Sequence, residues 1–379
     1  MAPDRFYIYG YYGSKNAGDE AFRLAFEQLL PADSQLHFIR PSELANNQEL
    51  SGRIQRETAQ GLARLIVGGG AIIGEPYFWA HLPPQTPYHI VSADIGSQDN
   101  LVRNYRPTLQ GLQISWIRSE TDTKELCRLC PSNKQIHYLP DIVLSLGASR
   151  QQQGTITAID QATRNKQLRQ SMEQYCENIQ PESNLRNKNM AIFLSDHYYD
   201  YKTIQSSCIL EGVEREAADK NYLRQLRLSL NEISPYYNFY FFSLSFWHNS
   251  IDAFVGYQIA KASPQPELYN LATQYIPPET VMDLMPYFDA AISMKFHGLI
   301  FPMTANVPVL NLGNSKKNRD LSQQMGIISL APEQLSVDTF LASLKQVESV
   351  EYATSLAETR RLAHESIHTA FATPGLWNQ

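Results

Sequence analysis

The sequence lacks a long hydrophobic run and a surplus of positive charge. No segment reaches the ~18 consecutive apolar residues that a membrane-spanning helix needs, and the most apolar stretch, 292–312, contains Lys295, His297 and Asn306. The formal net charge is −6. A general nucleic-acid binder, whose affinity comes from an excess of Lys and Arg, is therefore not expected. A small anionic substrate stays possible, because a few local cations are enough to bind one.

Cysteines are also scarce, at four in 379 residues. Cys127 and Cys130 form a C-x-x-C pair at the end of a helix-like stretch, whereas Cys176 and Cys208 are isolated. A zinc site would need two further paired ligands, so we interpret all four as packing thiols and predict no metal site. The N-terminal residues lead straight into a strand-like segment without a signal-peptide core, and we expect a cytoplasmic protein with reduced thiols.

Short apolar segments alternate with longer helical patterns, which indicates parallel βαβ units. The alternation breaks at a polar stretch over 149–167 and then restarts, so the chain is predicted to hold two α/β domains. We expect two Rossmann-like, doubly wound domains facing a cleft that receives the carboxyl ends of the strands. The predicted ranges are an N-terminal domain over 1–150, a linker and helix over 151–188, a C-terminal domain over 189–346 and a C-terminal helix over 347–379.

The first candidate site is the segment Gly-Tyr-Tyr-Gly-Ser-Lys-Asn-Ala-Gly-Asp-Glu-Ala, residues 10–21. It stands where the first predicted strand turns into the first helix, and helix N-termini offer free N–H groups to a ligand. One interpretation is a tight turn in which Asp19 and Glu20 lie favourably at the positive end of the helix dipole. The other is a ligand-binding turn whose acids serve as a general base toward a hydroxyl group. The spacing alone supports both equally.

Two further segments follow predicted strands of the first half. Gly68–Gly70 ends an apolar strand, and three consecutive glycines cost roughly 0.5–1 kcal/mol each relative to alanine, which favours a ligand-lining role over a simple bend. Arg118 ends the strand-like segment around Trp116. A guanidinium there can bind a carboxylate or phosphate in bidentate fashion. Read alone, however, it fits a solvent-exposed strand end better.

The most informative segment is Ala-Ile-Ser-Met-Lys-Phe-His-Gly-Leu, residues 291–299. A predicted strand delivers Lys295 and His297 to the start of the next helix, where the helix dipole already attracts anions. The next strand is followed by another cationic turn, 316–319. Two neighbouring cationic turns in an acidic protein predict an anion site. The alternative for 316–319 is a solvated basic loop.

Residues 364–368 match H-E-x-x-H, the signature of zinc proteases. The remaining tail, 369–379, contains no His, Asp, Glu or Cys to act as a third ligand. The segment also belongs to a predicted terminal helix of a two-domain α/β chain. We interpret the match as accidental.

Taken together, these segments resemble the polysaccharide pyruvyl transferase family, in particular the bacterial cell-wall-polymer pyruvyltransferases. The similarity spans about Tyr7 to Gly326 and rests on the following segments: Gly10–Ala21, Gly68–Gly70, Arg118, Pro140-Asp141, Ser293–Phe301, Pro308–Leu312 and Lys317. The first motif and the Ser-x-x-x-His-Gly pattern are fairly specific, whereas the glycine triplet is not.

The resemblance implies a fold similar to the GT-B glycosyltransferases and transfer of pyruvate from phosphoenolpyruvate onto two sugar hydroxyls as a cyclic ketal. It implies that Arg118, His297 and Lys317 bind the donor. The chain departs from the family pattern at Lys295, where an Arg is frequent, and at Ser119 and Glu75, where an Asp is frequent.

The mechanism that follows from this resemblance needs an acid and a base. His297 is the expected acid, and Asp19 or Glu20 the expected base. The expected substrate-binding residues are Arg118, Lys317, Lys295, Gly298, Gly13, Asn16, Gly69, Gly70 and Asp141.

Phosphoenolpyruvate would be a co-substrate, and no cofactor or metal is predicted. The expected partner is a glycan or lipid-linked oligosaccharide acceptor, through which the protein would associate peripherally with the inner face of the membrane. Two other functions stay open. One is a GT-B glycosyltransferase that uses a nucleotide sugar, and the other is a non-catalytic carbohydrate-binding protein.

Overall fold

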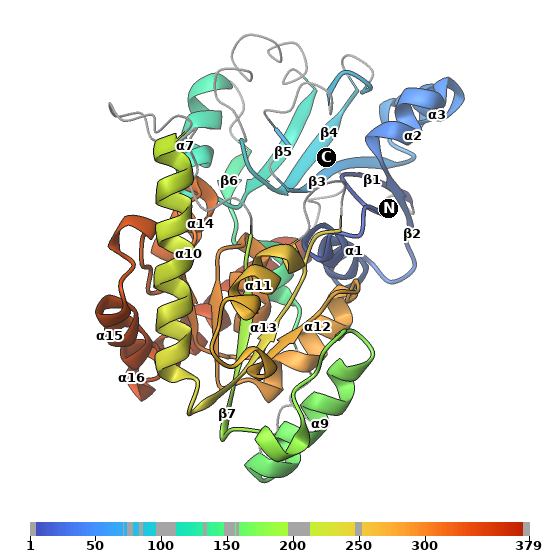
Figure 1. Cartoon of the computed structure of the whole chain (residues 1–379). Helices are drawn as coiled ribbons and strands as arrows, with labels where there is room; N and C mark the ends of the chain where they lie inside the picture. Colours follow the sequence, from blue (N-terminus) through green and yellow to red (C-terminus); the bar gives the residue numbers. More distant parts are fainter. Residues whose placement is uncertain are drawn as a thin grey trace. The chain divides into compact units, whose positions relative to one another are not determined.

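The computed structural model describes residues 5–70, 72–73, 79–82, 86–95, 111–131, 135–147, 156, 159–195, 213–246 and 252–373, with the backbone alone for 213–219. The chain divides into two compact units (Figure 1). Unit 1 comprises Met1–Leu146 and Leu362–Gln379, and unit 2 comprises Gly147–Arg361. The long last helix, α16 (Val350–Ala372), begins in unit 2 and ends in unit 1.

Unit 1 is built on a six-stranded sheet with the order β2-β1-β3-β4-β5-β6, in which every pairing is parallel. Its strands are β1 (Arg5–Tyr9), β2 (Gln35–Ile39), β3 (Arg64–Gly70), β4 (Tyr88–Ala93), β5 (Leu112–Ile117) and β6 (Ile136–Tyr138). Its described helices before α16 are α1 (Ala17–Leu29), α2 (Pro41–Asn46), α3 (Gln48–Ala59), α7 (Glu120–Leu129) and the 3-10 turn η1 (Ile142–Ser145). The central strands β3 and β4 are buried on both faces, as a sheet covered by helices requires.

Unit 2 is built on a five-stranded parallel sheet with the order β11-β10-β7-β8-β9. Its strands are β7 (Lys188–Phe193), β8 (Tyr237–Phe241), β9 (Tyr269–Leu271), β10 (Ala290–Ser293) and β11 (Val309–Asn311). Its helices are α9 (Gln161–Glu173), α10 (Val213–Ile233), α11 (Asp252–Lys261), α12 (Pro278–Leu284), α13 (Phe296–Thr304), α14 (Lys316–Met325) and α15 (Val337–Val347), with 3-10 turns η2 (Glu182–Asn184), η3 (Pro266–Leu268), η4 (Met285–Tyr287) and η5 (Pro332–Gln334). Helices α10, α11 and α15 share one core with the sheet, and α10 and α15 lie close together in Figure 1.

The predicted class, two doubly wound parallel α/β domains with a helical C-terminus, is confirmed. The boundaries differ from those expected. Unit 2 begins at Gly147, so 161–188 is part of that unit, where α9 packs against β7. The apolar segment 135–146 forms β6 followed by η1, because Pro140 cannot continue the strand.

The glycine triplet at the end of β3 has a packing role. Strand alternation places Val67 on the face covered by α3 and α7 and Gly68 on the face covered by α1. A Cβ on Gly68 would lie 2.6 Å from Phe26, and one on Gly69 would lie 2.5 Å from Phe22. Gly69 and Gly70 also have φ angles of +79° and +84°. The triplet therefore lets α1 approach the sheet closely, which is a structural reason for residues that we expected to line a ligand.

We predict that Gly69→Ala destabilises unit 1 more than Gly61→Ala. Gly61 also has a positive φ, +70°, but a Cβ there would find only Arg64, at 3.9 Å. Gly61→Ala should cost about 1–2 kcal/mol from backbone strain alone, whereas Gly69→Ala adds overpacking worth about 1–3 kcal/mol. Thermal and urea unfolding of the two variants measures this difference. Equal loss of stability in both would show that the contact with Phe22 is unimportant.

Candidate functional site

The cationic side chains of unit 2 lie at the carboxyl ends of two neighbouring strands. β10 leads through Lys295 into α13, and β11 leads through a short turn into α14. β10 pairs directly with β11, so the two helix N-termini start side by side at one sheet edge. Lys295, His297 and Gly298 stand at the first of them, and Lys317 at the second. The structure brings these four predicted site residues together.

Gly298 allows α13 to begin close to the sheet. A Cβ at this position would lie 2.3 Å from Ser293 Oγ and 2.6 Å from Phe193 Cβ. Ser293 Oγ accepts a hydrogen bond from the Lys295 backbone N–H at 2.9 Å, which fixes the turn. Lys295 is the N-cap residue of α13, and its side chain accepts no hydrogen bond from the first turn of that helix. That turn therefore presents backbone N–H groups that suit an anion.

Lys295 is held by an acid of its own unit. Its ammonium lies 2.6 Å from Asp252 Oδ1, and the Asp252 side chain is 1% exposed. Asp252 Oδ2 also accepts hydrogen bonds from the backbone N–H groups of Leu244 and Ser245, each at 3.0 Å. Burial raises the pKa of Asp252, and the nearby ammonium opposes that shift. Lys295 is thus a positioned cation whose charge is largely balanced.

His297 and Lys317 both lie near the ring of Phe296. The half-buried His297 ring stands edge-on to the Phe296 ring, with 5.2 Å between centroids. Lys317 is exposed, and its Nζ lies 6.0 Å from the Phe296 centroid. Asn318 connects the start of α14 to the turn after β10, because its side-chain amide donates a hydrogen bond to the Met294 carbonyl at 2.9 Å.

The other cations of the 316–319 turn are bound locally. Lys316 Nζ forms an ion pair with Asp320 at 3.0 Å, and the Arg319 guanidinium donates to Asn314. A solvated basic loop describes these two residues well. Lys317, which lies over Phe296, differs from them in direction.

Arg118 of unit 1 is buried rather than exposed. Its guanidinium binds Asp94 at 2.5 Å and Asp141 at 2.8 Å, and its side chain is 2% exposed. Asp94 directly follows β4, Arg118 directly follows β5, and Asp141 lies shortly after β6. Desolvation by burial raises the pKa of Asp141, and Arg118 counteracts that rise. The expected clamp open to a ligand is not what the structure shows, because two carboxylates of the same unit already occupy this guanidinium.

Asp141 and Ser119 also make hydrogen bonds that stabilise helix starts at the same sheet edge. Asp141 Oδ1 also accepts from the Val143 N–H at 2.9 Å and so caps η1. Ser119, one of the departures from the family pattern, is the N-cap of α7 and accepts from the Asp122 N–H. These contacts explain both residues without a substrate.

The segment 10–21 forms a turn and the first turn of α1. Asn16 is the N-cap and accepts from the Gly18 N–H at 3.0 Å. Gly13 has a φ of +73° and donates its N–H to Glu20, which lies 3.6 Å from Arg23. Asp19 is partly buried, and its Oδ1 lies 3.6 Å from where a Cβ of Gly70 would be. Both interpretations of this segment, a tight turn and a ligand-lining turn, are compatible with this geometry.

Sequence reasoning named Asp141 but missed two other acids that bind the predicted cations, Asp94 and Asp252. Asp94 stands immediately after a buried strand, so its place at the carboxyl edge could have been noticed. Asp252 gives no local signal, because it reaches Lys295 only through the fold. Glu75, the third departure from the family pattern, lies outside the described residues.

The H-E-x-x-H match and the cysteines show no arrangement for metal binding among the described residues. The His364 and His368 rings lie 4.3 Å apart on α16, and the described residues hold no group of three or more His, Cys, Asp or Glu side chains arranged for a metal ion. Cys127 is an exposed free thiol, and Cys130 and Cys176 are half-buried free thiols. Cys208 lies outside the described ranges.

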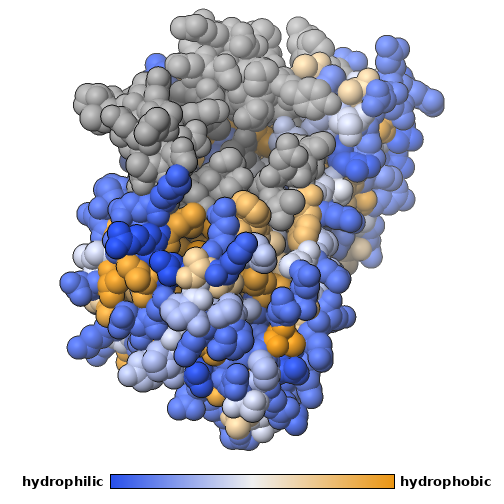
Figure 2. Space-filling view, in the orientation of Figure 1, coloured by the Kyte–Doolittle hydropathy of each residue, from blue (hydrophilic) through white to orange (hydrophobic). Residues whose placement is uncertain are grey.

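None of the helices in the described part of the chain combines the length and apolar character needed to cross a membrane. On the face drawn in Figure 2, the described residues are mostly hydrophilic, and hydrophobic ones form small separate groups.

Solved structures with similar folds include proteins described as UDP-GlcNAc 2-epimerases and as a UGT transferase. No protein-family model matches the chain, and no curated protein matches its sequence. The UDP-GlcNAc 2-epimerase from Methanocaldococcus jannaschii is 12% identical at a TM-score of 0.51, covering 94% of this chain and 98% of that one. A putative UDP-N-acetylglucosamine 2-epimerase from Listeria monocytogenes is 10% identical at a TM-score of 0.52, covering 97% and 96%. A UGT transferase from Siraitia grosvenorii is 10% identical at 0.50, covering 99% and 97%. The fold is therefore of the GT-B type, with two Rossmann-like domains.

We predict that Arg118→Met destabilises unit 1 by about 3–5 kcal/mol, because it leaves Asp94 and Asp141 buried without their cation. The loss should shrink as the pH falls from 7 to 5. A carboxyl group whose folded-state pKa is raised binds more protons in the folded state, so its contribution to stability declines as the pH rises. Thermal unfolding across this pH range measures the effect.

The matched control is Arg128→Met, because Arg128 makes its ion pair with Glu125 on the exposed face of α7. This variant should lose at most about 1 kcal/mol, with little dependence on pH. Similar losses in the two variants would contradict the importance of the buried ion pairs.

Proposed function

We propose that this protein is a pyruvyltransferase that moves the enolpyruvyl unit of phosphoenolpyruvate onto two hydroxyls of a glycan sugar. The products are a cyclic pyruvate ketal and inorganic phosphate. The observation that carries the proposal is the meeting of His297 and Lys317 on Phe296, at two adjacent helix N-termini. The resemblance of 291–299 to the pyruvyl transferase motif gives this anion site its substrate.

The donor phosphate is assigned to the N-terminus of α13, with His297 and Lys317 as its cationic partners. Backbone N–H groups at a helix start and a nearby ammonium are a common arrangement for binding phosphate. Lys295 supports the site through the turn that it forms between β10 and α13. Because Asp252 already binds its ammonium, we assign Lys295 to positioning rather than to direct phosphate binding.

The reaction needs a proton donor for the methylene carbon of phosphoenolpyruvate. Protonation of C3 gives an oxocarbenium-like C2, to which the first sugar hydroxyl adds and loses its proton. Phosphate then leaves with the electrons of its bond to C2, and the second hydroxyl adds to close the ring. His297 is the proposed acid, since it belongs to the first turn of α13, to which the phosphate is assigned.

The base is proposed to be Asp19 or Glu20 in the first turn of α1. Glu20 accepts the Gly13 N–H and lies near Arg23, whereas Asp19 lies against Gly70. Since Arg118 binds two carboxylates in unit 1, its proposed role is to fix the ends of β4, β5 and β6 rather than to contact the donor.

A glycosyltransferase that uses a nucleotide sugar is the second candidate, and the GT-B fold favours it. Several structures of this fold, by their descriptions, act on UDP-GlcNAc or bind UDP. The two candidates differ in their co-substrate. Phosphate release from phosphoenolpyruvate in the presence of a glycan, without turnover of UDP-sugars, would favour pyruvyl transfer, and the reverse result would favour glycosyl transfer.

We predict that His297→Gln lowers kcat for pyruvyl transfer by about 100-fold or more, because it removes the general acid. Lys317→Gln should raise the KM for phosphoenolpyruvate by about 10-fold or more, because it removes a charge-assisted hydrogen bond to phosphate. Phosphate release and the mass of the glycan product, which gains a carboxyethylidene group, measure both effects.

Lys316→Gln is the matched control. It removes a positive charge from the same turn, but Lys316 is bound to Asp320 rather than directed to Phe296. This variant should keep kcat and KM within about 3-fold of the wild type. Near-normal activity of His297→Gln would remove this residue from the mechanism.

A further inference from the structure

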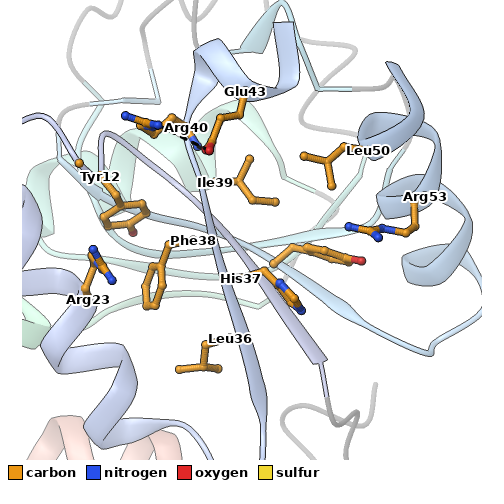
Figure 3. Close-up of a pocket in the computed structure, with 12 residues that line it drawn as sticks. Tyr12, Arg23, Leu36, His37, Phe38, Ile39, Arg40, Glu43, Leu50 and Arg53 are labelled. Atoms are coloured by element: carbon orange, nitrogen blue, oxygen red, sulfur yellow. Dashed lines mark hydrogen bonds and ion pairs between the residues drawn. The ribbon is translucent and has the colours of Figure 1, made fainter. Parts of the chain in front are cut away.

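A polar pocket of about 560 Å³ lies around the edge strand β2 in unit 1. Its walls come from α1, β2, α2 and α3, and Figure 3 shows the side chains that line it. β2 pairs with β1 on one side, and no strand within the described ranges pairs with its other edge. No residue of the donor site in unit 2 takes part in this pocket.

The pocket is rich in guanidinium groups. Arg23, Arg40 and Arg53 line it, and Glu43 is the one carboxylate among its lining residues. Arg40 lies 3.6 Å from Glu43, and Arg23 lies 3.6 Å from Glu20, which does not line the pocket. Arg53 makes no hydrogen bond or ion pair with any residue that the structure describes. The residues that line the pocket therefore carry more positive than negative charge, although the chain as a whole is acidic.

One of these arginines, Arg23, lies on an aromatic side chain. The Arg23 guanidinium lies over the Phe38 ring at 5.1 Å from its centroid, and Tyr12 meets Phe38 edge-on at 5.2 Å. His37 projects to the opposite face of the strand, as alternation requires. Figure 3 shows Arg23 and Phe38 on one side of β2, with His37 and Arg53 on the other. A guanidinium fixed on a ring loses less entropy when it binds a ligand.

We propose that this pocket binds a sugar phosphate. Guanidinium forks match the oxygens of a phosphate, and the free strand edge offers further backbone N–H donors. The cavity is larger than a phosphate alone and falls in the size range of small-molecule sites. A sugar ring attached to the phosphate fills the remaining polar volume. The same chemistry is present in soluble sugar phosphates and in lipid-linked glycosyl phosphates.

A simpler explanation is that the arginines only protect the edge strand. Charged side chains beside an unpaired strand discourage pairing between copies. Protection of this kind needs exposed charge, but it does not need a cavity or a guanidinium fixed on an aromatic ring. The two explanations make opposite predictions for Arg53.

The test is calorimetric titration of the full chain with glucose 1-phosphate and with inorganic phosphate. We expect saturable binding of glucose 1-phosphate that weakens about 10-fold or more in Arg53→Gln and in Arg23→Gln, as loss of a charge-assisted hydrogen bond requires. The control is Arg56→Gln, because Arg56 is exposed on the same helix but does not line the pocket. It should bind as the wild type does.

Two arms separate the sources of the phosphate. Stronger binding to phosphatidylcholine vesicles containing polyprenyl phosphate than to plain vesicles, lost in Arg53→Gln, supports the site with a lipid-linked ligand. Binding of glucose 1-phosphate without vesicle binding supports the site with a soluble ligand.

Absence of saturable binding to any of these probes, or equal weakening by Arg53→Gln and Arg56→Gln, overturns the proposal. So does association of Arg53→Gln into oligomers with unchanged binding, which would establish edge protection instead. None of these outcomes depends on pyruvyl transfer.

Discussion

The pairing of Arg118 with Asp94 and Asp141 organises the carboxyl edge of the unit 1 sheet. Each of the three side chains comes from the end of a different strand, so one guanidinium connects three loops. Both carboxylates are buried, and neither is stable there without a cation. The guanidinium also lies 5.9 Å from the Phe22 ring of α1. Since Phe22 is the residue that Gly69 accommodates, the ion pairs and the glycine triplet constrain the same helix.

Unit 2 also contains a buried acid that binds a cation at the carboxyl edge of its sheet. Asp252 holds Lys295 beside the start of α13, and backbone N–H groups satisfy the other oxygen of that carboxylate. This arrangement fixes the turn but leaves His297 and Lys317 directed to Phe296. In unit 1 two buried acids bind the guanidinium, whereas in unit 2 His297 and Lys317 stand in the first turns of two neighbouring helices. This contrast is why we place the donor in unit 2.

The contrast also separates the two kinds of anion site that we propose. The donor site depends on helix N-termini, where backbone dipoles and a few side chains converge on one phosphate. The pocket around β2 depends on guanidinium groups and an unpaired strand edge. The residues assigned to the donor phosphate belong to unit 2, and the residues that line the pocket belong to unit 1.

The sequence by itself determined the α/β class, the two-domain organisation and most strand positions. These follow from local patterns, since a buried parallel strand must be a short apolar run and its helices must follow it. It also placed Lys295, His297 and Lys317 at strand-to-helix turns, because that placement is local. A break near residue 150 and a C-terminal helix were predicted, but not that 161–188 belongs to unit 2 or that α16 ends in unit 1, since a unit is defined by contacts rather than by composition.

Only the tertiary structure decided which charges are available to a ligand. Nothing near Arg118 in the sequence reveals that Asp94 and Asp141 will surround it, because the three meet through strand order. The same holds for Asp252 with Lys295, and for Phe22 with Gly69. An isolated motif specifies which groups reach a sheet edge, but the net charge and space at that edge depend on partners distant in sequence, which only the packed fold brings within a few ångströms.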